Sequence, residues 1–223
     1  MNFKFSSSAA WRSAAAIMAL PLMVATAAAD SEMTDFAFEI VDPGFCIMPP
    51  AEVTDAQLRD MRAEQADDLL LTGEIEGPVE AGLYGGGFFA RGAERNAVAS
   101  SLHAMIIPDE GEIAALCLVV VPVNEMDSTE GDVVLRGPDA DPEDGDYYMV
   151  FARMLGRDSD GSHVIADLEA GEGVIDFAED RGEMIDGTMS LSGDLSDGKT
   201  LQIAFTFSLI EDEHLRFLDL SGD

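Results

Sequence analysis

Positively charged residues are scarce in this sequence. The 223 residues include 12 lysines and arginines against 44 aspartates and glutamates, which gives a formal net charge of −32 at pH 7. A surface of this charge repels nucleic acid and anionic lipid headgroups. The acids are spread along the chain, which favours a hydrated surface, as in proteins from saline habitats, over acidic loops that bind Ca²⁺ or basic partners. We therefore expect no nucleic-acid partner.

Long hydrophobic runs are missing too, and the longest lies near the first residue. A basic segment precedes the apolar run 14–24, and alanines ending at Ala29 then present the small-residue pattern that signal peptidase cleaves, directly before Asp30. The run is shorter than the roughly 20 residues of a membrane-spanning helix. An N-terminal membrane anchor is the alternative. We expect a signal peptide over residues 1–29, a soluble protein in the periplasm or outside the cell, and no stable membrane insertion after cleavage.

The chain left by such a cleavage, residues 30–223, is long enough for one domain with a substantial core. Cleavage removes Lys4, Arg12 and the only tryptophan, Trp11. The remaining 10 basic residues face 44 acidic ones, so the net charge falls to about −34. The most apolar stretch, 116–123, has the length of a strand. We expect a single, mostly β domain.

Cysteine is rare, and both cysteines, Cys46 and Cys117, lie in this remaining part. An even number of cysteines in an oxidising compartment suggests one disulfide. The disulfide would close a loop of about 70 residues, which is worth roughly 3–4.5 kcal/mol by the loop-entropy model. Two buried free thiols are the alternative. Neither cysteine has a histidine or second cysteine at ligand spacing, which argues against a metal or catalytic role.

Catalytic motifs are missing as well. The three histidines, His103, His163 and His214, are far apart in the sequence, and no two have ligand spacing. A Ser-His-Asp set could be assembled from Ser101 or Ser162 and any of many acids, so it carries little information. The sequence has no G-x-S-x-G elbow, H-E-x-x-H helix or paired-cysteine motif. We therefore expect a non-catalytic binding or structural role and assign no catalytic residue. The alternatives are a secreted hydrolase of unrecognised site and a calcium-dependent binding module that uses loop 137–146.

Helical patterns are few. Thr54 followed by Gln57 forms a capping box, and apolar residues follow at helical spacing, which predicts a helix over about 54–66. Phe36 to Ile40 alternates between apolar and other residues, which predicts a strand.

The C-terminal part carries the clearest β pattern. Residues 187–209 indicate a hairpin, and in its second arm apolar side chains alternate with polar ones. Residues 97–107 fit a helix or a strand, and we favour the strand because a turn then leads into the apolar strand 113–123. Many short strands separated by Gly and Asp turns indicate a mainly β fold: an antiparallel β-sandwich or open barrel with one N-terminal α-helix packed against it.

One acidic loop, residues 137–146, offers oxygen ligands at alternate positions, as a hard cation prefers. It lacks the glycine and glutamate that an EF-hand has at its sixth and twelfth positions. A solvated turn is the alternative. The candidate Ca²⁺ ligands are Asp139, Asp141, Glu143, Asp144 and Asp146. We expect no other cofactor.

A glycine-rich stretch, 82–92, also contains aromatic residues. It lacks the Lys-Ser/Thr that follows a phosphate-binding loop, and its simplest interpretation is a flexible connection. Exposed aromatic side chains on loops commonly mark binding surfaces. If this loop contacts a ligand, the contact residues are Tyr84, Phe88 and Phe89.

Overall fold

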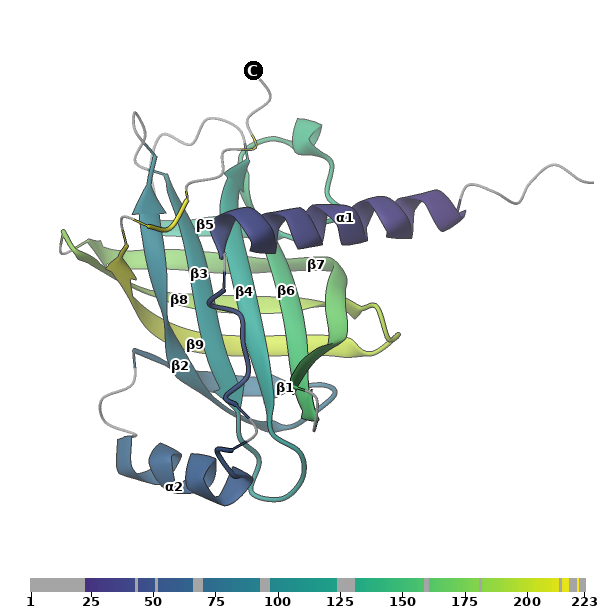
Figure 1. Cartoon of the computed structure of the whole chain (residues 1–223). Helices are drawn as coiled ribbons and strands as arrows, with labels where there is room; N and C mark the ends of the chain where they lie inside the picture. The colour runs from purple at the N-terminus through teal and green to yellow at the C-terminus, as the bar shows by residue number, and fades with distance from the viewer. Residues whose placement is uncertain are drawn as a thin grey trace, which may run out of the picture.

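Nine β-strands and two α-helices make up the described part of the chain in the computed structural model (Figure 1). The structure describes residues 23–42, 44–50, 52–65, 70–92, 97–123, 131–158, 161–180, 182–212, 214–216 and 220. The elements are α1 (Met23–Val41), α2 (Asp55–Gln65), β1 (Leu71–Glu76), β2 (Ala81–Arg91), β3 (Val98–Ile106), β4 (Ala114–Val123), β5 (Gly131–Arg136), a 3₁₀ turn (Pro142–Asp144), β6 (Tyr147–Asp158), β7 (Gly161–Asp180), β8 (Met184–Leu195) and β9 (Thr200–Glu211).

The strands form one sheet that closes into a barrel in the order β1-β2-β3-β4-β6-β5-β7-β8-β9, with β9 pairing back to β1. Most neighbours are antiparallel, whereas β5 pairs with β6 and β2 with β9 in parallel. The prediction of a mainly β fold is confirmed. The predicted strand 97–107 and the predicted C-terminal hairpin are confirmed as β3 and as β8–β9.

Apolar side chains fill the barrel. Along β9 the side chains alternate between buried and exposed, as expected for a strand with one face on the core. The aromatic rings of Tyr148, Phe177 and Phe207 meet inside, with centroids 5.8 and 5.9 Å apart. The continuous apolar stretch of β4 has a different cause, because this strand is buried on both faces. Its inner face belongs to the barrel core, and its outer face, which carries Cys117, belongs to a second core cluster.

The second cluster lies between the outer face of the sheet and the chain that precedes the barrel. Figure 1 shows α1 crossing one face of the barrel, and the segment after it running along β3 and β4 towards α2. The predicted strand at 36–40 is therefore wrong. The buried residues of α1, Thr34, Ala37, Phe38 and Val41, recur at the helical spacing of three and four, and this stripe outweighs the alternation of Phe36, Phe38 and Ile40.

Arg153 on β6 holds α1 against the sheet. Its guanidinium donates two hydrogen bonds to Asp167, at 2.7 and 2.9 Å, and a third to Asp35 of α1. The guanidinium also lies over the ring of Phe38, 5.1 Å from its centroid. The hydrogen bonds to Asp167, and to a smaller extent the one to Asp35, raise the pKa of Arg153 above its ordinary value. The N-terminal helix is therefore fixed by a charged anchor as well as by apolar packing.

α1 also spans the expected cleavage position between Ala29 and Asp30, while residues 1–22 lie outside the described part. Among the α1 side chains that the structure describes, from Glu32 onwards, those of Ala37, Phe38 and Val41 pack on the sheet. Among the described residues, no helix combines the length and the apolar character that crossing a membrane requires.

The predicted helix 54–66 is confirmed as α2, with the capping box in place: Thr54 N donates to Gln57 Oε1 at 2.8 Å. The predicted flexible glycine-rich loop at 82–92 is wrong, because these residues form β2. Gly85 and Gly87 let β2 lie close to β3, where an added Cβ would collide with the carbonyl oxygens of His103 and Ser101. These two glycines thus allow a close approach of neighbouring strands and do not form a flexible connection.

Candidate functional site: an apolar pocket beside a buried carboxylate

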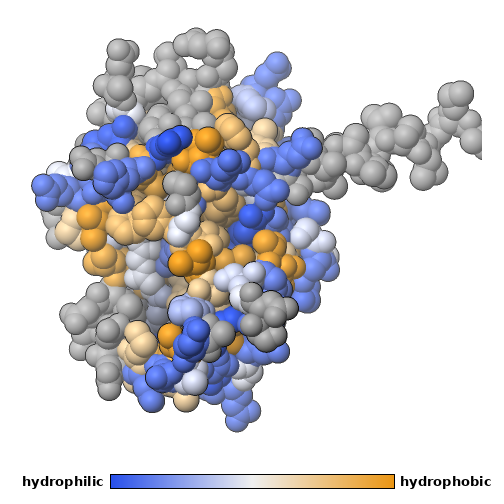
Figure 2. Space-filling view, in the orientation of Figure 1, coloured by the Kyte–Doolittle hydropathy of each residue, from blue (hydrophilic) through white to orange (hydrophobic). Residues whose placement is uncertain are grey.

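A pocket of about 480 Å³ opens on the outer face of β2 and β3, beside segment 44–50. Its walls are mostly apolar or aromatic, and the side chains that shape them are Phe45, Ile47, Met48, Tyr84, Phe88 and Ile210. Ile47 is 62 % exposed. Figure 2 shows hydrophobic residues gathered on the face that α1 and segment 44–50 cross, among hydrophilic surroundings. On a protein this acidic, such a concentration of exposed apolar surface marks a candidate binding site.

A missing side chain creates the hollow. Tyr84, Gly86 and Phe88 alternate along β2 and share its outer face, and Gly86 pairs with His103 of β3. An added Cβ at Gly86 would make only ordinary contact with Leu70, at 3.6 and 3.9 Å. Gly86 therefore leaves open a space that a larger residue could occupy without backbone strain.

The opposite wall, segment 44–50, is tied to the barrel. The predicted disulfide between Cys46 and Cys117 is confirmed and links this segment to β4, with the two Cα atoms 5.7 Å apart. The backbone N–H of Met48 donates to Ser162 Oγ on β7 at 3.1 Å. These contacts fix the wall across the outer face of β3 and β4.

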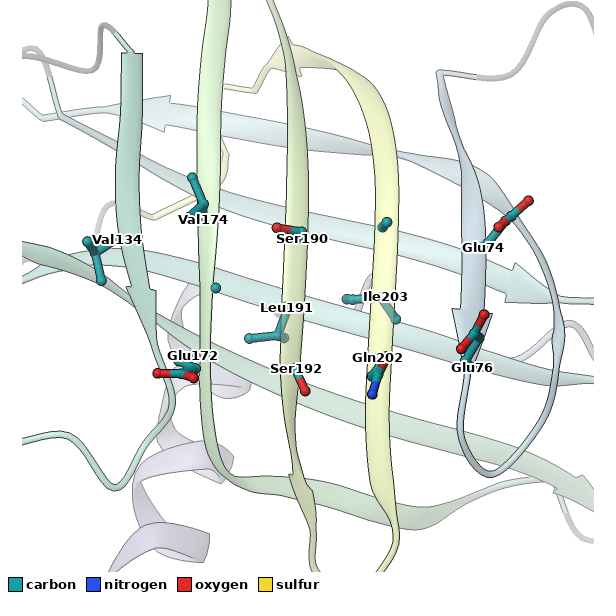
Figure 3. A pocket seen from close by; sticks show the side chains of 12 residues that line it. Glu74, Glu76, Val134, Glu172, Val174, Ser190, Leu191, Ser192, Gln202 and Ile203 are labelled. Carbon is teal, nitrogen blue, oxygen red and sulfur yellow. The ribbon is translucent and has the colours of Figure 1, made fainter.

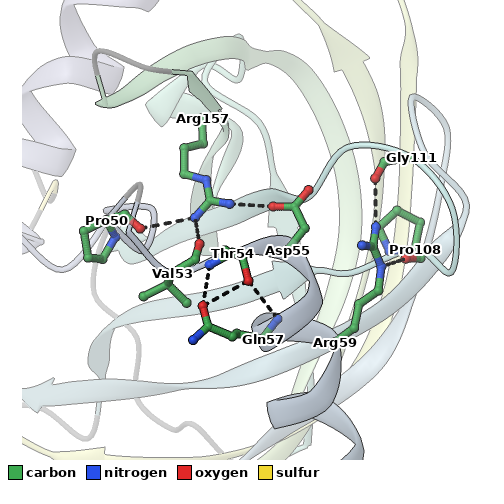
Figure 4. A network of polar contacts seen from close by, with 9 residues as sticks. All are labelled: Pro50, Val53, Thr54, Asp55, Gln57, Arg59, Pro108, Gly111 and Arg157. Carbon is green, nitrogen blue, oxygen red and sulfur yellow. Dashed lines mark hydrogen bonds and ion pairs between the residues drawn. The ribbon is translucent and has the colours of Figure 1, made fainter.

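A polar network holds the end of the same wall (Figure 4). Arg157 of β6 donates to the carbonyls of Pro50 and Val53, at 3.3 and 2.6 Å, and pairs with Asp55 at the start of α2. Arg59 on α2 donates to the carbonyls of Pro108 and Gly111, at 3.1 and 2.9 Å, in the β3–β4 connection. α2 therefore braces the pocket wall against the barrel.

One polar cluster lies at the pocket floor. Asp42, which follows α1, is only 2 % exposed, and its carboxylate accepts hydrogen bonds from Ser101 Oγ at 2.6 Å and from Phe45 N at 2.9 Å. His103 Nε2 lies 2.8 Å from Asp42 Oδ2. A buried carboxylate is costly unless donors satisfy it, and here three donors surround it. Ser101 and His103 line the pocket.

This cluster contains the residue types of a hydrolytic triad in a different order. In such a triad the histidine stands between the serine and the acid, and takes the serine proton. Here Ser101 donates directly to Asp42, and His103 bonds the same carboxylate. Ser101 is also only 1 % exposed. The arrangement orients His103 and does not activate a serine.

A ring nitrogen of His103 also lies within 4.8 Å of the sulfurs of Cys46 and Cys117, the only such group of possible metal ligands among the residues described. Zinc and similar ions bind the thiolate form of cysteine. The two sulfurs form a disulfide, so a metal is not supported at this position.

The predicted contact residues divide between the pocket and the core. Tyr84 and Phe88 line the pocket, whereas Phe89 is fully buried inside the barrel because neighbouring residues on a strand face opposite sides. Sequence reasoning missed the polar cluster. The alternate positions of Ser101 and His103 on a predicted strand do place both on one face, but the partner Asp42 is about 60 positions away, and no local pattern points to it.

The predicted Ca²⁺ ligands do not converge. Asp141 caps the 3₁₀ turn by accepting from Glu143 N at 2.9 Å, and Asp144 pairs with Arg136 at 3.1 Å. Within the described ranges, the loop carboxylates form no group close enough to share one ion. The turn geometry and the arginine account for the positions of these two acids without a cation.

A second hollow, of about 610 Å³, lies on the outer face of β1, β5, β7, β8 and β9 (Figure 3). Glu172 lies on one side of it and Glu74 and Glu76 on the other, with Ser190 and Ser192 between them. These carboxylates do not meet, and exposed acidic groups are expected anywhere on a chain of this charge. The hollow beside Asp42 is therefore the stronger candidate.

Comparisons with protein-family models, with curated proteins and with solved structures found no match to this chain.

Proposed function

We propose that this chain is an exported, non-catalytic binding protein that holds a small, mainly apolar ligand between segment 44–50 and strands β2 and β3. The observation that carries the proposal is an apolar pocket with a single buried polar cluster at its floor. Sites for small molecules are typically concave and mostly apolar, with a few polar groups that orient the ligand, and measure about 300–1,000 Å³. The pocket of about 480 Å³ falls within this range.

Two features support a binding role over catalysis. The buried serine donates to the carboxylate instead of to the histidine, which leaves no activated nucleophile in this cluster. The walls are also held by a disulfide and by charged hydrogen bonds, as expected for a preformed site that binds without large rearrangement.

The proposal of export is supported by the N-terminal sequence and by the disulfide. The basic start, the short apolar run and the alanines before Asp30 have the organisation of a signal peptide. The disulfide between Cys46 and Cys117 is the kind of bond that persists in an oxidising compartment.

The test is saturable binding of an uncharged fluorescent probe, N-phenyl-1-naphthylamine, to the purified protein from Asp30 onwards. Gly86→Leu places a side chain in the pocket, and we expect it to weaken probe binding by about tenfold or more, equivalent to 1.4 kcal/mol. Ala204→Leu adds an apolar side chain on the outer face of β9, in the second hollow, and serves as the matched control. Absence of saturable binding, or equal loss in both variants, would contradict the proposal.

A further inference from the structure

We infer that the ligand carries a cationic amine head, which the pocket binds through His103 and the aromatic walls while the second hollow takes no part. This inference rests on the proposed function, because it names the chemical class that the same pocket would select.

The floor presents an acceptor. An ionised carboxylate only accepts hydrogen bonds, so Nε2 of His103 carries the proton in its bond to Asp42. The other ring nitrogen, Nδ1, then has a free lone pair whenever the imidazole is neutral, and it bonds to no protein group in the described part of the chain. The His103 side chain is 29 % exposed and lines the pocket. A ligand that donates a proton complements this floor.

The walls suit a cation. The rings of Phe45 and Phe88 stand with centroids 5.1 Å apart at the pocket. Aromatic faces attract ammonium groups, by about 0.5–1 kcal/mol at exposed sites and more where water is excluded. An amine head can therefore be held from the side by rings and from below by the imidazole.

An anionic head would find no lysine or arginine side chain in the described lining of the pocket. The guanidinium of Arg62 lies over the Tyr84 ring at 5.5 Å and already binds Ile107 O at 2.7 Å and Asp109 at 3.2 Å. The net charge of −32 also raises the local concentration of cations around the whole protein. Charge therefore favours an amine over a carboxylate.

The experiment compares three ligands with one aromatic body: 1-naphthylmethylamine, 1-naphthalenemethanol and 1-naphthoate. Each displaces the uncharged probe from the wild-type protein at low salt, near pH 8, where ordinary imidazoles are neutral and the amine is charged. We expect the amine to bind about tenfold more tightly than the alcohol, and the carboxylate most weakly. The preference for the amine should shrink as added salt screens the charges.

Two isosteric variants test which carboxylate is responsible for the preference for the amine. Asp42→Asn removes one buried negative charge and should reduce the preference of the pocket for amine over alcohol, whereas Glu74→Gln removes one charge in the second hollow and should not. If Asp42→Asn does not fold, NMR of isotope-labelled histidine in the wild type replaces it, and the amine should shift the His103 imidazole resonances.

The outcomes separate the two proposals. Equal affinity for the three ligands or tightest binding of naphthoate would overturn the amine inference and leave an apolar binding pocket. An amine preference of unchanged size in folded Asp42→Asn would overturn the contribution of the buried carboxylate to that preference. Failure of every ligand and of the uncharged probe to bind would overturn the proposed function itself. An amine that binds without moving the His103 resonances would refute the role of the imidazole.

Discussion

The disulfide between Cys46 and Cys117 connects two cysteines 71 positions apart, and its removal should cost a large part of the stability of the fold. The double variant Cys46→Ala/Cys117→Ala releases a loop that contains α2, β1, β2 and β3. The chain-entropy model assigns a loop of this length about 4 kcal/mol at 25 °C. Cys117 is fully buried in the outer core cluster, so the lost sulfur adds about 1 kcal/mol of packing.

Urea unfolding followed by circular dichroism measures this effect, and we expect the free energy of unfolding to fall by about 4–5 kcal/mol with little loss of native β signal. A reducing agent should destabilise the wild type by a similar amount and leave the double variant unchanged, which is the control. Probe binding should also weaken, because segment 44–50 would then be held by noncovalent contacts alone, among them those to Ser162 and Arg157.

A loss below about 1.5 kcal/mol would refute the loop-entropy reasoning, since it would mean that the unfolded chain gains little freedom when the bond is absent. Unchanged probe affinity in a folded double variant would show that the noncovalent contacts alone hold the pocket wall. The two readouts therefore test the energetic and the functional role of the disulfide separately.

Three further predictions concern stability. Arg153→Met removes the bonds to Asp167 and Asp35 and should lower the free energy of unfolding in urea by about 2–3 kcal/mol, because Asp167 would remain largely buried without its partner. The control is Arg136→Met, which removes an exposed ion pair and should cost less than about 1 kcal/mol. Burial raises the pKa of Tyr148 to about 12, so its neutral form stabilises the fold fully below pH 10 and progressively less between pH 10 and 12. Relative to Tyr148→Phe, the wild type should therefore lose about 2 kcal/mol of its free energy of unfolding by pH 12. Stabilities of the two proteins that fall in parallel above pH 10 would contradict this. Stability should rise from low to high salt as screening relieves repulsion among the 44 acids, and an unchanged urea midpoint would count against it.

Local pattern was sufficient for much of the fold. The alternation along residues 201–209 predicted β9, because one face of a strand at a core must be apolar. The capping box at Thr54 predicted the start of α2, because its hydrogen bonds connect residues three apart. The disulfide could be predicted from composition, because two cysteines can form only one intramolecular disulfide. In each case the interacting residues are either close together in the sequence or are the only residues of their type.

Tertiary structure decided the rest. Phe36 to Ile40 fits a strand by alternation, and only packing on β3, β4, β6 and β7 selects the helical stripe of Ala37, Phe38 and Val41. Residues 82–92 have the glycines of a loop, and only the close approach of β3 makes them a strand. The pocket belongs to this second class, since Asp42 meets Ser101 and His103 only when α1 has docked on the sheet. Charge and the alternation of strands are properties of the local sequence. A site built from residues about 60 positions apart exists only after the barrel closes and its outer face is covered.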